Sequence, residues 1–137
     1  MRIAWLLLAL SLLPSAEAAY DPAALEVCKL HNAKSYFFDC LRIIKDRQFE
    51  DEALTACKEH RYSDDLNYCL AIVADGNYQT VALEACRRHN TASFYNGCLR
   101  AIKNKRYTEE EIGLCKEFNW PDEYNECLRL VGTPVRG

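Results

Sequence analysis

The eight cysteines place the strongest constraint on how this chain can fold. The separations between successive cysteines alternate between 12 and 17 residues, at Cys28, Cys40, Cys57, Cys69, Cys86, Cys98, Cys115 and Cys127. The pattern therefore repeats every 29 residues, and a period of about 20–50 residues is typical of proteins built from stacked structural units. The sequence predicts one domain over residues 19–137 with four units, at residues 20–48, 49–77, 78–106 and 107–137.

Each unit carries the signals of two short helices. It begins with an aromatic residue and has an aliphatic residue five positions later, as at Tyr78 and Leu83, which matches the apolar pair that braces a helix start. The second half of the unit has the i, i+3, i+4, i+7 apolar spacing of an amphipathic helix. In the third unit these residues are Tyr95, Cys98, Leu99 and Ile102. No segment alternates apolar and polar residues over a useful length, so the sequence predicts an all-α fold, an α/α solenoid of four helix hairpins.

The helix ends can be predicted by comparing equivalent positions, here called a column. We expect the first helix of each unit to run about ten residues, to a column in which asparagine favours a left-handed ending. That column contains Asn32, Arg61, Asn90 and Asn119. We expect the second helix to begin at a column of good N-cap residues. These are Ser35, Asp64, Ser93 and Asp122.

Two disulfide pairings are compatible with the spacing. Links between cysteines 12 residues apart would close each unit, whereas links 17 apart would join neighbouring units and leave Cys28 and Cys127 unpaired at opposite ends. We therefore predict the pairs Cys28–Cys40, Cys57–Cys69, Cys86–Cys98 and Cys115–Cys127. Helices of about ten residues are marginal alone, and closing a loop of this size stabilises by about 3 kcal/mol in the chain-entropy model.

Residues 1–18 have the features of a cleaved signal peptide. Arg2 precedes an apolar run at residues 3–13, and Ala16-Glu17-Ala18 fits the small-x-small cleavage rule. The run is shorter than the roughly 20 residues that span a bilayer. We expect cleavage after Ala18, no transmembrane segment thereafter, and a periplasmic or extracellular protein in which the cysteines form a disulfide framework.

The three histidines occupy one column, three residues after the first cysteine of a unit. They are His31, His60 and His89. Histidine and cysteine at this spacing can ligate a metal, but the fourth unit has Phe118 in the column and oxidised cysteines do not ligate as thiolates. We expect no metal and no other cofactor, with the histidines packed near the disulfides at the helix C-termini.

Charge and polar patterning give the candidate binding residues. The net charge is +1, −5, +5 and −4 in the four units, which fits either attraction between neighbouring units or a basic belt at the third. A polar stripe is also expected to face solvent along the second helices, where it is either a binding surface or only a solvated face. The candidate site comprises Asn96, Arg100, Lys103, Arg87 and Arg129. Guanidinium and amide groups suit carboxylates on an acidic protein or envelope polymer, whereas the chain's net charge of −3 argues against nucleic acid.

No catalytic residue can be assigned from the sequence. It contains no glycine-rich phosphate loop and no serine–histidine pair at a telling spacing. We expect an exported, disulfide-rich helical repeat protein that acts as a protein–protein or envelope-associated binding or assembly module. The alternative is an envelope-directed enzyme or a small-ligand-binding protein of the periplasm. A binding module should carry its chemistry on an open face, and an enzyme should have a closed pocket with a perturbed acid or base.

Overall fold

The computed structural model describes residues 19–135, and the predicted signal peptide at residues 1–18 lies outside the described residues. Within this part the chain forms eight helices and two very short strands. The helices are α1 (Pro22–Cys28), α2 (Lys34–Ile44), α3 (Asp51–Lys58), α4 (Ser63–Val73), α5 (Thr80–Cys86), α6 (Ala92–Ile102), α7 (Glu109–Cys115) and α8 (Pro121–Val131). The prediction of a helical fold with two helices per unit is confirmed. None of these helices is long and apolar enough to cross a membrane.

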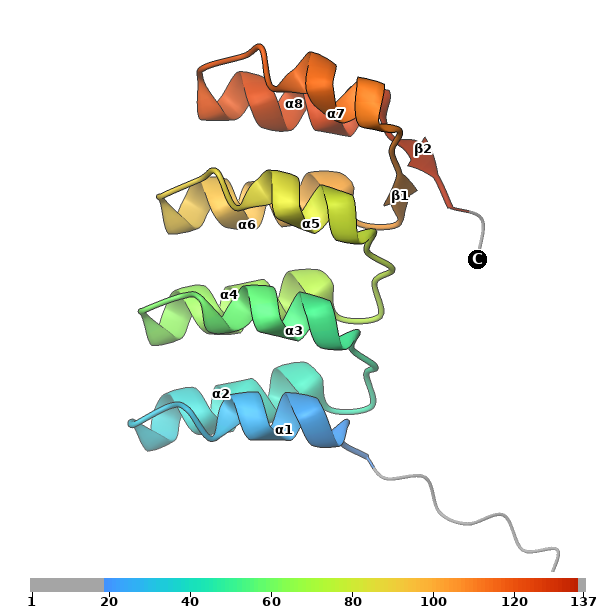
Figure 1. Ribbon diagram of the computed structural model, residues 1–137. Coiled ribbons are helices and arrows are strands. Elements are labelled where there is room, and N and C mark those ends of the chain that lie inside the picture. Colours follow the sequence, from blue (N-terminus) through green and yellow to red (C-terminus); the bar gives the residue numbers. More distant parts are fainter. Residues whose placement is uncertain (1–18, 136–137) are drawn as a thin grey trace, which may run out of the picture.

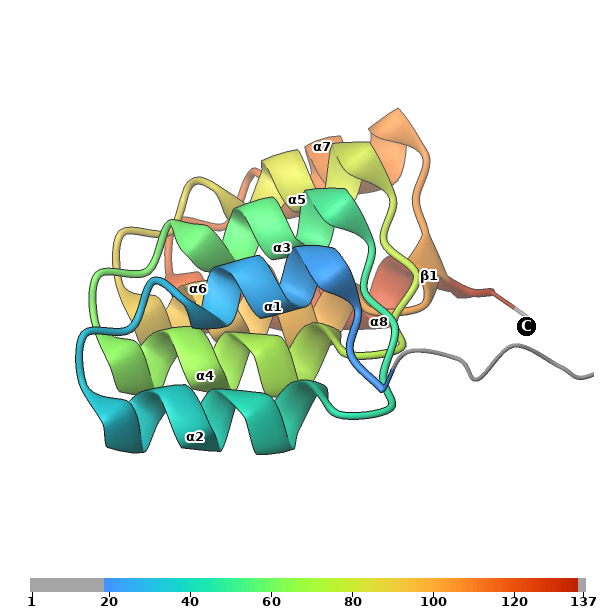
Figure 2. The same ribbon diagram turned by 90° about the horizontal axis from the view of Figure 1, so that it is seen from below.

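The four helix hairpins lie one above another (Figure 1). Helices α1, α3, α5 and α7 form one row, and α2, α4, α6 and α8 form a second row beside it (Figure 2). Each helix contacts its own hairpin partner and the equivalent helix of a neighbouring unit. The core lies between the rows and is built from the predicted apolar columns, with Leu54, Leu70, Leu99 and Ile102 almost completely buried.

Each hairpin is closed by its own disulfide, with the pairing that the sequence predicts. The four links are Cys28–Cys40, Cys57–Cys69, Cys86–Cys98 and Cys115–Cys127, with Cα–Cα distances of 5.4–5.6 Å. The first helix of each unit has only seven or eight residues, not the predicted ten. Isolated helices of this length are unstable in water, so the disulfide and the packing between rows must hold them.

The predicted helix boundaries are wrong at two columns. The described residues with left-handed backbone are Asp46, Asp75 and Asn104, at the return turn between units, and not the column of Asn32. Aspartate and asparagine tolerate this conformation better than most residues. It lets the Asp75 N–H donate to the Gln48 carbonyl and the Asn104 N–H donate to the Asn77 carbonyl, each at 2.8 Å, which ties successive linkers together.

The second helices begin earlier than the predicted N-caps. Their N-cap positions are Ala33, Tyr62, Thr91 and Trp120, and none of these side chains caps the helix. The predicted caps lie inside the first turn. There, Asp64 accepts a hydrogen bond from the next backbone N–H at 3.0 Å, and Asp122 does the same. Their carboxylates therefore still interact favourably with the helix N-terminus.

The expectation of no strand is wrong at the C-terminal end. Strand β1 (Lys105–Arg106) pairs antiparallel with β2 (Thr133–Pro134). In units 1 to 3 the corresponding linker leads into the next helix. After unit 4 the chain turns back, and the Val135 N–H donates to the Asn104 carbonyl at 2.8 Å. Strand β2 therefore runs beside β1 and away from the outer side of α7 and α8 (Figure 1).

Candidate functional site

Three histidine–asparagine pairs join the four units. The Nε2–Oδ1 distances are 2.7 Å for His31–Asn67, 2.8 Å for His60–Asn96 and 2.7 Å for His89–Asn125. In every pair the asparagine Nδ2 also donates to a backbone carbonyl of the preceding unit, at 3.0–3.4 Å. A carbonyl can only accept, so the amide oxygen faces the ring and the histidine Nε2 carries a proton and donates.

This arrangement corrects the prediction for Asn96. The sequence pattern predicts that Asn96 lies on a solvent-facing stripe, but its exposed fraction is 1%, and Asn67 is also buried. Its column faces the preceding unit, so it is covered by the stack and not by the hairpin core. The three histidines bond to the next unit through these asparagines. Within residues 19–135 no group of three or more His, Cys, Asp or Glu side chains is arranged to hold a metal ion.

The linkers between units repeat a second set of contacts. The backbone N–H of Phe49 donates to Asp21 Oδ2 at 3.2 Å, that of Tyr78 to Glu50 Oε2 at 3.2 Å, and that of Tyr107 to Gln79 Oε1 at 2.7 Å. The fourth unit has Thr108 at this column, which forms a capping box with Glu111. In this column, units 1 to 3 therefore carry a side chain that accepts a hydrogen bond from the backbone of the following unit. Unit 4 carries a residue that caps its own helix instead.

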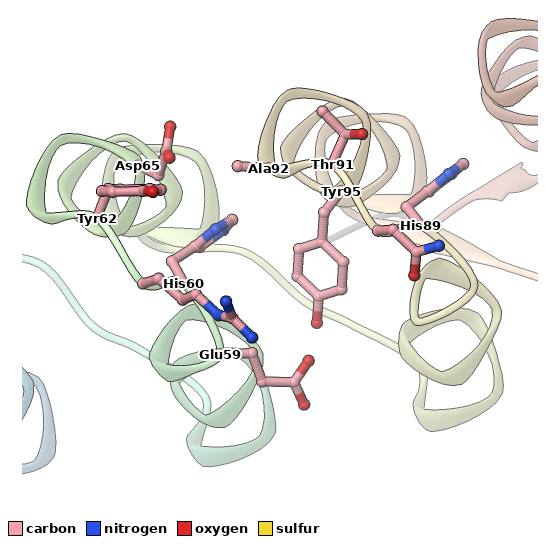
Figure 3. Close-up of a pocket in the computed structure, with 10 residues that line it drawn as sticks. Glu59, His60, Tyr62, Asp65, His89, Thr91, Ala92 and Tyr95 are labelled. Atoms are coloured by element: carbon pink, nitrogen blue, oxygen red, sulfur yellow. The ribbon is translucent and has the colours of Figure 1, made fainter.

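A depression of about 210 Å³ lies between the hairpin tips of units 2 and 3. The Tyr95 ring projects from α6 between His60 with Glu59 on one side and His89 on the other (Figure 3). The Tyr95 hydroxyl is buried and has no hydrogen-bond partner among the described residues. Its counterpart in unit 4 donates to the Ala85 carbonyl at 2.9 Å.

Two ionisable groups around this depression are perturbed. Burial, followed by the nearby negative charge of Glu59, raises the pKa of Tyr95, so its hydroxyl stays protonated at neutral pH. Burial lowers the pKa of His89, against the opposing effect of its bond to Asn125, so its ring stays neutral at pH 7. A protonated phenol and a neutral, hydrogen-bonded imidazole suit a structural junction better than proton transfer.

A second candidate surface, made of exposed tyrosine and arginine side chains, runs along the second helices of the units. Tyr36 of α2 and Tyr68 of α4 line one depression of about 440 Å³ together with Arg42. The Arg100 guanidinium of α6 lies over the Tyr68 ring, 5.3 Å from its centroid, and donates to the Tyr68 hydroxyl. We call these four residues the lateral surface: Tyr36, Arg42, Tyr68 and Arg100. All four are exposed, and three helices contribute to the set.

The predicted site residues do not form one cluster. Arg100 is exposed, as expected, and Arg129 occupies its column in α8, where it pairs with Glu126. The prediction that Lys103 points to solvent is wrong, because it is half-buried and its Nζ donates to the Ala74 carbonyl at 3.0 Å.

Arg87 lies in the other row of helices. Its guanidinium is 3.4 Å from the Glu59 carboxylate and 3.8 Å from that of Glu84. The pair with Glu59 joins the basic third unit to the acidic second unit, and Arg47 pairs similarly with Asp75 at 3.7 Å. Both pairs are exposed and contribute little stability, but they show that part of the charge alternation is used between neighbours.

No family model matches this sequence, and no curated protein or solved structure is significantly similar to it. The class of protein therefore rests on its own structure: a small, disulfide-rich helical protein. Four disulfides within residues 19–135 fit an oxidising location, extracellular or periplasmic.

Proposed function

We propose that the chain is an exported α-helical solenoid with a single domain over residues 19–137, and that it binds a protein partner through the lateral surface. The N-terminal segment would direct export and be removed after Ala18. The observation that carries the proposal is the exposed Tyr68–Arg100 pair, which lies beside the depression lined by Tyr36 and Arg42.

The residue types of the lateral surface are those that dominate protein interfaces. Tyrosine and arginine are enriched at the energetically important centre of interfaces, because each combines a large contact area with a polar end. The Tyr68 side chain is 51% exposed although it is aromatic, and Arg100 stacks on it. Stacking orders the guanidinium before a partner arrives, so less conformational entropy is lost on binding.

The charge of the surface indicates the chemistry of the partner. No carboxylate within residues 19–135 lies within 4 Å of the Arg100 guanidinium, whereas Arg42 and Arg129 each pair with an acid three residues earlier in the same helix. Arg100 belongs to the third unit, whose net charge is +5. A carboxylate on the partner, next to an apolar side chain that enters the depression, would satisfy both features.

An enzyme or small-ligand site is supported less well. The depression near His60 measures about 210 Å³ and is open to solvent, whereas pockets that enclose small ligands are commonly about 300–1,000 Å³. The Nε2 atom of His60 is already hydrogen-bonded to Asn96. The lateral depression is larger but shallow, which suits a protruding side chain of a protein.

The test compares three proteins as bait in an extract of the source cell's envelope and surroundings. Wild-type protein should retain a specific partner, and a Tyr68→Ala/Arg100→Glu variant should retain it with at least tenfold lower affinity, as expected for loss of an interface centre. Tyr62→Ala is the matched control, because Tyr62 is 70% exposed but lies at a hairpin tip. Equal affinity of the double variant and wild type, measured with the purified partner, would show that the lateral surface does not bind it.

A further inference from the structure

The two ends of the stack are unusually apolar for surfaces that face solvent. The end repeats of stacked proteins generally carry a polar outer face, because their outer columns have no neighbour. Here the outer side of unit 4 exposes apolar side chains, which we call the C-terminal face: Leu114, Phe118, Leu130 and Val131. The outer side of unit 1 carries another apolar set, which we call the N-terminal face: Leu25, Phe37, Phe38 and Leu41. Phe38 is 51% exposed, and the other three are only partly buried.

These faces are the same columns that form the internal junctions. Leu114 occupies the column of Ala56 and Ala85, both of which are buried in units whose first helices contact that of the following unit. In the same way, Leu41 of unit 1 is only half-buried, whereas Leu70 and Leu99 in its column are completely buried and lie on helices that contact the preceding unit. Each end of the molecule therefore presents one half of a junction.

The histidine and asparagine columns change together at the two ends. The histidine column ends in Phe118, which is 39% exposed, and the asparagine column begins with Phe38, which is 51% exposed. Either polar residue would be readily hydrated at an open end, whereas each phenylalanine leaves apolar surface in water. Suppose that a second molecule stacks on unit 4 with the geometry of an internal junction. Phe118 of the first molecule would then occupy the histidine position of that junction, and Phe38 of the second molecule would occupy the asparagine position.

We propose that the C-terminal face of one molecule binds the N-terminal face of a second copy in the register of an internal junction. Phe118 of one copy packs on Phe38 of the next, and this apolar pair replaces the histidine–asparagine pair. The two faces differ, so the contact is heterologous, and every copy added leaves another face open. The product is a head-to-tail chain of molecules and not a closed symmetric dimer.

The distribution of charge also favours a second copy of this chain as the binding partner. The units alternate +1, −5, +5 and −4, and a second copy placed after unit 4 continues the alternation with +1. Asp122, Glu123 and Glu126 border the C-terminal face. Successive second helices contact each other along the stack, so Lys34 at the start of α2 in the next copy would lie near Asp122 and Glu123 at the start of α8.

Residues 133–135 leave the C-terminal face accessible. Strand β2 pairs with β1, and Val135 bonds to Asn104, so residues 133–135 follow the linker of unit 3 and do not cover α7 and α8 (Figure 1). This inference goes beyond the lateral surface and does not depend on it, because the faces lie at the ends of the rows.

The experiment measures the mass distribution of the oxidised protein by sedimentation velocity, from micromolar to millimolar concentration. Wild-type protein should form species that grow beyond dimer as its concentration rises. Phe38→Glu and Phe118→Glu should each remain monomeric alone, because each blocks one face. An equimolar mixture of these two variants should form a one-to-one dimer and nothing larger, because one intact face of each kind remains.

Two further variants control for nonspecific effects. Phe118→His and Phe38→Asn should each weaken association at least tenfold, and the two changes together in one chain should restore it, because they recreate the internal pair between copies. The Tyr68→Ala/Arg100→Glu variant should associate like wild type, which separates this contact from the lateral surface. A wild-type protein that stays monomeric throughout, a mixture that forms no dimer, or a wild-type dimer that only Phe118→Glu disrupts would each overturn the proposal.

Discussion

Replacing both Cys86 and Cys98 with alanine should lower the free energy of unfolding by about 3 kcal/mol, which corresponds to a melting temperature about 10 °C below wild type. The link closes a loop with a sequence separation of 12 residues, and its removal returns that loop's conformational freedom to the unfolded chain. Both cysteines are completely buried, so the smaller alanine side chains also leave unfilled space.

The position of this disulfide should increase its effect. It closes the third unit, whose helices contact both neighbouring units, so a loosened hairpin affects two junctions. The matched control is the Cys115→Ala/Cys127→Ala variant, which opens a loop of the same length in the end unit. Thermal unfolding followed by circular dichroism should place the control between wild type and the Cys86/Cys98 variant. A Cys86/Cys98 variant that melts within about 2 °C of wild type would contradict this expectation.

Asn96→Ala should cost about 2–4 kcal/mol of unfolding free energy although it removes only one polar side chain. The change leaves the His60 Nε2–H and the Asp65 carbonyl without their partner, and an unsatisfied buried group costs about 1–3 kcal/mol. Asn96 is buried, so water cannot readily replace the lost amide.

Two controls distinguish the junction from a general effect of losing asparagine. Asn125→Ala removes the equivalent histidine–asparagine contact between units 3 and 4. Asn125 is partly exposed, so water can replace the amide and the loss of unfolding free energy should be smaller. Asn90→Ala removes an exposed side chain of the same unit and should change the free energy of unfolding by less than about 0.5 kcal/mol. Urea denaturation measures all three. Equal losses for Asn96→Ala and Asn90→Ala would show that the histidine–asparagine pair does not hold the units together.

The period and the disulfide pairing could be predicted because they depend on covalent spacing. Cysteines such as Cys57 and Cys69 fix the register, and only the within-unit scheme pairs every cysteine. The apolar stripe of each second helix was equally visible, because it follows the 3.6-residue period of one helix packed on its hairpin partner. These features are local to one unit.

The burial of Asn96 could not be predicted from the same pattern. A helix in a stack is covered on three sides: by its hairpin partner, by the preceding unit and by the following unit. The polar residues that contact a neighbouring unit lie beside the apolar stripe of the helix. In the sequence they look the same as polar residues that face solvent. The partner of Asn96 is 36 residues away, so no helical periodicity reports it. The pairing is indicated only when equivalent positions are compared between units, because the histidine column ends with Phe118 and the asparagine column begins with Phe38.

The candidate site was predicted only in part. Arg100 is exposed as expected, but the sequence pattern does not indicate its neighbour Tyr68, because the other units have Asp39, Gly97 and Glu126 at that column and no repeated signal marks it. Helix geometry predicts that Lys103 faces solvent, but Lys103 lies just after the end of α6, where the chain leaves the helical path. Features unique to one unit or located at helix ends therefore required the structure.

Whether each 29-residue unit is a helix hairpin closed by its own disulfide is tested most directly by peptide mapping without reduction. Between Cys69 and Cys86 the sequence has no lysine or arginine, so trypsin leaves both cysteines in the single peptide 62–87. With the disulfides of the structure, this peptide must be recovered covalently joined to both 48–58, through Cys57, and 89–100, through Cys98. Cleavage with an Asp/Glu-specific protease after Asp75 should then divide the cluster into two linked pairs. Recovery of 62–87 as a separate peptide with an internal Cys69–Cys86 link would contradict the hairpin structure.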